Sequence, residues 1–136
     1  MTDEIEVMAL TENRQVVIDF VNGYLEEMGA SMMAQTQIGI AVEEIFVNIA
    51  LYAYAPDTGE AVIRVETDRG SDQISITFMD TGKPFDPLAR PDPDVTLSGD
   101  ERSIGGLGIF MVKKSMDDMR YEYRDGKNIL RITKKL

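Results

Sequence analysis

Apolar residues in the first part of the chain recur every three or four positions, the spacing that places side chains on one face of a helix. This pattern predicts one helix over Asn13–Met28, ended by Gly29, and a second from about Met32 to Tyr54. The stripe of the second helix consists of Ile38, Ala41, Val42, Ile45, Ile49 and Tyr52. Residues Glu4–Leu10 alternate in polarity and predict a first strand ahead of both helices.

Alternation typical of half-buried strands returns in Ala61–Thr67 and Gln73–Met79, and again in Tyr121–Arg124 and Asn128–Thr133, which pair across Asp125-Gly126. Helical spacing reappears between the two pairs, at Ile109, Val112, Met116 and Met119. The element order is therefore β-α-α-β-β-loop-α-β-β. It predicts the α+β class, with a mixed, mostly antiparallel sheet covered on one face by three helices.

The chain has 136 residues, of which 43% are hydrophobic and 28% charged, as in an ordinary globular protein. At this length we expect a single domain over residues 1–136. The longest apolar runs are much shorter than the ~20 residues of a membrane-spanning helix. The acidic start, Met1–Glu6, does not resemble a secretory signal. We therefore expect no membrane association and a cytoplasmic location.

The net charge and the absent residue types exclude several kinds of catalytic site, metal site and partner. The chain contains no His and no Cys, which excludes a Ser-His-Asp triad, a thiol nucleophile and a zinc site built on either residue. The net charge of −10 argues against a nucleic-acid partner, because binding to phosphate backbones depends on an excess of Lys and Arg. Catalysis would have to use carboxylates, hydroxyls, amines or a bound metal.

The first candidate motif is Glu44 and Asn48 on the second predicted helix. One helical turn separates them, so both lie along the edge of the apolar face, while Glu43 points to the opposite side. An Asn oxygen can bind Mg²⁺ and a Glu can act as a general base. The alternative is an ordinary polar pair on a solvated helix surface.

The second candidate motif, Asp80-Thr-Gly82, directly follows a predicted strand. A carboxylate at a strand end accepts a hydrogen bond from an amino group, and the glycine allows a ligand to approach the backbone closely. Asp-x-Gly is also a common turn sequence, which is the alternative interpretation.

A long Pro- and Gly-rich segment follows, and its glycine run is the third candidate motif. Residues Gly105-Gly106-Leu107-Gly108 precede the helix predicted from Ile109, where converging backbone N–H groups and the helix dipole favour a phosphate. Arg102 lies just upstream, and a guanidinium can bind a terminal phosphate through two hydrogen bonds. We interpret Pro87–Ile104 as a mobile lid over a bound ligand. A flexible hinge is the alternative for the glycines.

The ordered set of motifs resembles the GHKL ATPase superfamily of gyrase, heat-shock chaperone, histidine kinase and MutL ATP-binding domains. It is most similar to the RsbW-type branch, the anti-sigma factor serine/threonine kinases. The segments that carry the resemblance are Glu43–Asn48, Asp80–Pro87, Glu101–Ser103, Gly105–Ile109 and Asp125–Thr133. The resemblance implies a Bergerat-type ATP-binding sandwich.

By position, the resemblance implies that Asn48 binds the Mg²⁺ bridging the ATP phosphates, that Glu44 is the general base and that Asp80 binds the adenine amino group. The remaining nucleotide contacts that it implies are Gly82, Arg102, Gly105, Gly106, Leu107, Gly108 and Asn128. Three positions depart from the family pattern: Tyr52 stands where related kinases often have His, Pro84 where a second glycine is common, and Asn128 where Thr is usual.

The implied function is an ATP-binding anti-sigma factor that phosphorylates Ser or Thr of a STAS-domain anti-anti-sigma factor and holds a sigma factor inactive. The absence of His excludes autophosphorylation of the histidine-kinase type. Two alternatives stay open: a nucleotide-dependent binding module without phosphoryl transfer, and an ATPase domain serving a larger complex. The sequence leaves homodimerisation undecided.

Overall fold

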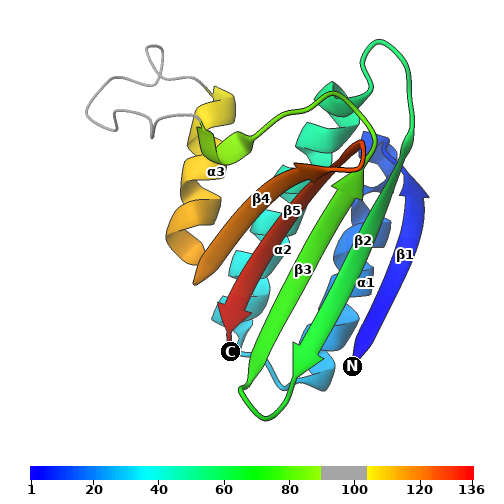
Figure 1. Ribbon diagram of the computed structural model, residues 1–136. Coiled ribbons are helices and arrows are strands. Elements are labelled where there is room, and N and C mark those ends of the chain that lie inside the picture. Colours follow the sequence, from blue (N-terminus) through cyan, green and yellow to red (C-terminus); the bar gives the residue numbers. More distant parts are fainter. Residues whose placement is uncertain (90–103) are drawn as a thin grey trace.

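The computed structural model describes residues 1–89 and 104–136. Five strands form one sheet in the order β1-β2-β3-β5-β4, and each neighbouring pair is antiparallel. The strands are β1 (Thr2–Met8), β2 (Glu60–Asp68), β3 (Gln73–Asp80), β4 (Asp118–Arg124) and β5 (Lys127–Lys135). Three helices, α1 (Arg14–Glu27), α2 (Met32–Asn48) and α3 (Ile104–Ser115), lie on one side of the sheet (Figure 1). The α+β prediction is confirmed, with an antiparallel rather than a mixed sheet.

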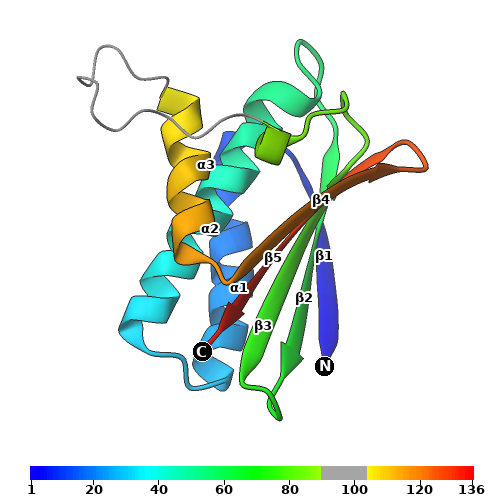
Figure 2. The ribbon, with the colours of Figure 1, turned by 60° about the vertical axis from the view of Figure 1, so that its left-hand side comes forward.

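The hydrophobic core lies between the sheet and the helices, which form two distinct layers (Figure 2). Alternate residues of β2 and β3 point into this core, and α1 and α2 contribute the faces that their apolar spacing predicts. Its most deeply buried large side chains include Val17, Val21, Leu25, Ile38, Val42, Ile45, Phe46, Ile63, Ile74, Ile76, Phe78 and Ile132. Burying each such side chain stabilises the fold by about 1.5–3 kcal/mol.

The turn between α1 and α2 follows from its sequence. Gly29 adopts φ +70° after α1, and the N–H of Ala30 donates to the carbonyl of Leu25 at 2.9 Å. This left-handed cap is the conformation that glycine favours at a helix end. Ser31 then caps α2, because its Oγ accepts a hydrogen bond from the N–H of Ala34 at 3.1 Å.

Helix α2 continues into a π-helical turn, η2 (Ile49–Ala53), close to the predicted end at Tyr54. Together these residues, Met32–Ala53, are long and apolar enough to cross a membrane by length and composition alone. A helix packed against a sheet meets the same criterion, and Ile38 and Phe46 are fully buried in the core. The apolar face of α2 is thus used within the fold.

Helix α3 departs from the prediction, because it begins at Ile104 and not at Ile109. The glycine run therefore lies inside the first turns of the helix instead of ahead of it. Glycine costs roughly 1 kcal/mol in a helix interior relative to alanine, which is why the sequence predicted a later start. From Gly108 onward, α3 packs on α2 through Ile109 and Val112, which are both buried.

Candidate functional site

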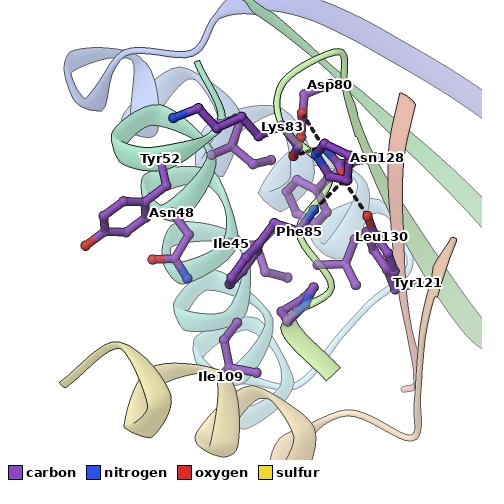
Figure 3. A pocket seen from close by; sticks show the side chains of 15 residues that line it. Ile45, Asn48, Tyr52, Asp80, Lys83, Phe85, Ile109, Tyr121, Asn128 and Leu130 are labelled. Atoms are coloured by element: carbon purple, nitrogen blue, oxygen red, sulfur yellow. Dashed lines mark hydrogen bonds between the residues drawn. The ribbon is translucent and has the colours of Figure 1, made fainter. Parts of the chain in front are cut away.

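A pocket of about 760 Å³, including the space at its open mouth, lies between the end of α2 and the adjoining ends of β3, β4 and β5. Its wall is mostly apolar, formed in part by Ile45, Ile49, Phe78, Ile109 and Leu130. A few polar side chains converge on it: Asn48, Asp80, Lys83, Tyr121 and Asn128 (Figure 3). An apolar cavity with a few fixed polar groups is the usual form of a small-molecule site.

Asp80 is the last residue of β3 and only 6% exposed. Its Oδ1 accepts two hydrogen bonds, from the N–H of Gly82 and from Nδ2 of Asn128, both at 2.9 Å. Its Oδ2 receives no hydrogen bond from the described residues and is available to a ligand. Burial raises the pKa of the Asp80 carboxyl, and the hydrogen bonds from Asn128 and Gly82 oppose that rise.

Asn128 lies opposite Asp80 in the β3–β5 register and is fully engaged by the protein. Its Nδ2 donates to Asp80 and to the carbonyl of Lys83, the latter at 2.8 Å. Its Oδ1 accepts from the N–H of Phe85 at 3.1 Å and from the hydroxyl of Tyr121. A carboxamide has two donor hydrogens and two lone pairs, so every hydrogen-bonding position is occupied. Asn128 lines the pocket, and its side chain orients Asp80 rather than offering a free polar atom to a ligand.

Gly82 is required by the packing of the loop after β3. A Cβ on this residue would lie less than 3.0 Å from the carbonyl oxygen of Ala53, at the end of η2. The next residue, Lys83, donates its N–H to the same oxygen at 2.9 Å. The loop is therefore hydrogen-bonded to the end of η2, and only glycine allows that approach.

The structure confirms the predicted register of α2. Nδ2 of Asn48 donates to Oε1 of Glu44 at 3.3 Å, so the two side chains lie together. Glu43 points elsewhere, with its Oε1 3.9 Å from Nε of Arg14 on α1. Gly108 of α3 lies against Glu44, because a Cβ on this glycine would be less than 3.0 Å from the Glu44 carboxylate.

The Glu44–Asn48 pair fits a magnesium ion held mainly by other ligands. Amide and carboxylate oxygens are the hard donors that Mg²⁺ prefers, and the hydrogen bond from Asn48 Nδ2 leaves its Oδ1 available. The described residues contain no group of three or more acidic side chains that could hold a metal. Such a sparse protein contribution is typical of Mg²⁺ bound together with phosphates and water.

The glycine run forms the start of α3, with Gly105, Gly106 and Leu107 in its first turn and Gly108 just after them. The first four N–H groups of an α-helix have no intrahelical partner, so this helix end can bind an anion. Arg102 and most of the predicted lid, Pro87–Ile104, lie outside the described residues.

The pocket is also lined by Tyr121, Lys83 and Phe85, which the sequence patterns did not predict there. Tyr121 reaches Asn128 diagonally across the β4–β5 pair, a relationship that becomes visible only once the strand register is known. Lys83 and Phe85 lie inside the Asp80–Pro87 segment, and only the loop conformation shows that they face the pocket.

Comparison with known proteins identifies the domain. Residues 7–134 match the sequence profile of the histidine kinase-like ATPase domain. The chain belongs to this family. This match confirms the resemblance inferred from the motifs. The pocket described above is therefore part of a histidine kinase-like ATPase domain.

Two relatives of this ATPase domain are named for kinase or anti-sigma activity. The serine-protein kinase RsbW of Listeria monocytogenes serotype 4a is 30% identical over 115 residues, covering 81% of this chain and 72% of the relative. An anti-sigma F factor of Clostridium perfringens is 26% identical over 131 residues, covering 96% of this chain and 93% of the relative. These names agree with the implied function.

A solved structure supports the fold. The crystal structure of the RsbU and RsbW domains of Rv1364c from Mycobacterium tuberculosis matches all of this ATPase domain with a TM-score of 0.70 at 16% identity. The match spans 32% of that chain.

Replacing Tyr121 by Phe is expected to loosen the Asp80–Asn128 pair in this ATPase domain. Removing the hydroxyl deletes one of the hydrogen bonds that orient Asn128, which should lower the free energy of unfolding by about 1 kcal/mol. We expect ADP affinity to fall roughly 3- to 10-fold, since a net hydrogen bond contributes about that much. Denaturant unfolding and calorimetric titration measure the two effects.

Tyr123→Phe is the matched control, because Tyr123 lies on the same strand and is 46% exposed. Equal behaviour of the two variants in both measurements would contradict a specific role for the Tyr121 hydroxyl.

Proposed function

We propose that this chain is an ATP- and Mg²⁺-dependent anti-sigma kinase that phosphorylates Ser or Thr of a STAS-domain anti-anti-sigma factor. The observation that carries the proposal is the arrangement of one pocket: Asp80 lies at its sheet side and Asn48 at its helix side (Figure 3), and Glu44 accepts a hydrogen bond from Asn48. A site of this kind can hold a base at one end and a metal-bound phosphate chain at the other. The names of the relatives support the same activity.

At the sheet side of the pocket, Asp80 recognises the adenine base of the nucleotide. Its Oδ1 is occupied by Gly82 and Asn128, so Oδ2 accepts a hydrogen bond from the adenine amino group. The apolar wall around it, including Ile45 and Phe78, excludes water and strengthens that hydrogen bond.

At the helix side, Glu44 and Asn48 carry the chemistry. Asn48 offers its Oδ1 to Mg²⁺, which when bound neutralises charge on the phosphate oxygens. Glu44 accepts the proton of the attacking Ser or Thr hydroxyl as the γ-phosphoryl group moves from ATP to that oxygen and ADP leaves. The N–H groups of Gly105 and Gly106, in the first turn of α3, donate to phosphate oxygens. Arg102 and Leu107 complete the proposed nucleotide contacts.

The proposed partners are two proteins, the STAS-domain acceptor and a sigma factor held inactive. The acceptor is a separate protein in this proposal, since the chain has no His for autophosphorylation of the histidine-kinase type. The net charge of −10 does not favour nucleic acid as a partner. We place the protein in the cytoplasm, where both partners act, and include homodimerisation in the proposal as a second association.

Intact-mass measurement of the acceptor tests the proposal. The chain is incubated with Mg-ATP and the STAS-domain protein encoded nearby, and an acceptor carrying one added phosphate is the expected result. The same incubation with ADP is the control. An unmodified acceptor, together with ATP binding by the chain, would contradict phosphoryl transfer and favour a nucleotide-dependent binding module.

A further inference from the structure

Lys83 is the one cationic residue among the described residues that line the pocket. The pocket also contains the carboxylate of Asp80, and the protein as a whole carries a charge of −10. A ligand with several negative charges entering this pocket therefore meets one positively charged side chain among the described lining residues.

The backbone of Lys83 is held at both ends of the residue. Its N–H donates to the carbonyl of Ala53 at 2.9 Å, and its carbonyl accepts from Nδ2 of Asn128 at 2.8 Å. The same Asn128 amide group orients Asp80. The Cα of Lys83 thus has a fixed position relative to the carboxylate that we propose reads the base.

The side chain of Lys83 is exposed, and its ammonium forms no ion pair or hydrogen bond with the described residues. Figure 3 shows it extending away from Asp80 and Asn128, toward the helix that carries Asn48 and Tyr52. A nucleotide with its base at Asp80 and its metal-bound phosphates at Asn48 also crosses the pocket from the sheet toward this helix.

We propose that Lys83 binds the phosphate chain of the nucleotide through its ammonium and so contributes to the preference for nucleotides over nucleosides. This inference rests on the proposed function, because it takes the base from Asp80 and the metal from Asn48. An ammonium on a flexible stem is a common phosphate ligand and binds as a point charge. Its contribution is selective, since adenosine presents no phosphate to it.

Calorimetric titration of Lys83→Met with ADP and with adenosine, both in the presence of Mg²⁺, tests the inference. Methionine keeps the unbranched shape and most of the length of the side chain and removes its charge. We expect ADP affinity to fall about 5- to 30-fold, a loss between those of an exposed ion pair and of a well-formed hydrogen bond to a charged group, and adenosine affinity to stay unchanged. Lys83→Arg keeps the positive charge and should retain most of the ADP affinity.

Lys135→Met is the matched control, because Lys135 pairs with Gln73 at the opposite end of the β3–β5 ladder from Asp80 and Asn128. It should bind ADP as the wild type does. Equal affinity of Lys83→Met and wild type for ADP would overturn the role of Lys83 and leave the proposed function standing. Equal losses for ADP and adenosine would also overturn it. Absence of ADP binding by the wild type would overturn the proposed function itself.

Discussion

Replacing Glu44 by Gln is expected to leave ATP binding intact and to slow phosphoryl transfer to the acceptor protein by roughly 10²–10⁴-fold, the range for losing a general base. Glutamine keeps the size of the side chain and can still accept the hydrogen bond from Asn48 Nδ2, so the local packing is retained. It cannot accept a proton from the attacking hydroxyl. Single-turnover transfer rates at saturating ATP measure the effect.

Glu43→Gln is the control, since this neighbouring carboxylate lies on the other side of α2, within 3.9 Å of Arg14. Both side chains of this Arg14–Glu43 ion pair are about half exposed, and such surface ion pairs contribute little to stability. Glu43→Gln should therefore leave the transfer rate nearly unchanged. A larger loss of transfer rate in Glu43→Gln than in Glu44→Gln would contradict the assignment of the base.

The second large effect is expected at Asp80, where replacement by Asn should abolish measurable binding of ADP and adenosine. Gly82 and Asn128 both donate to Oδ1, so an introduced amide would keep its oxygen there and turn its NH₂ group toward the pocket. That group would meet the amino group of adenine, donor against donor. Losing a charged hydrogen bond costs about 1.5–3 kcal/mol before this repulsion is added. Calorimetric titration measures the loss, and unchanged affinity would contradict base recognition by Asp80.

For the same variant, Asp80→Asn, we expect a gain rather than a loss in folding stability near neutral pH. Because burial raises the pKa of the Asp80 carboxyl, its ionised form opposes folding, and the wild type loses stability as pH rises through that raised pKa. Asp80→Asn removes the titration, so its free energy of unfolding relative to wild type should increase from acid to neutral pH. Denaturant unfolding at several pH values measures this trend. A relative stability that falls over the same interval would contradict it.

Much of the fold was predictable from local patterns. The buried faces of α1 and α2 match the apolar spacing, and the turn at Gly29 and the hairpin at Asp125-Gly126 have the positive φ angles expected there. In the site, the neighbouring positions of Glu44 and Asn48 follow from helical geometry alone. Each of these features depends on residues close together in sequence, where the local geometry has few solutions.

Features that join distant segments were not predictable in the same way. Asn128 meets Asp80 because β5 pairs with β3, and Tyr121 reaches Asn128 because β4 pairs with β5. The requirement for Gly82 depends on its distance from Ala53, a residue of another element. The early start of α3 also escaped prediction, because intrinsic preference alone does not include the packing of that helix on α2.

Because α3 begins with a glycine-rich turn, a change in the length of this helix costs little free energy. Three of its first five residues are glycines, and together they forfeit about 3 kcal/mol of helix-forming free energy relative to alanine. Unwinding this turn therefore costs less than unwinding any alanine-rich turn of equal length. A bound anion that prefers these free N–H groups in another arrangement can therefore change the residue at which α3 begins. Because Gly108 lies against Glu44, such a shift would change the surroundings of that carboxylate without any movement of α2.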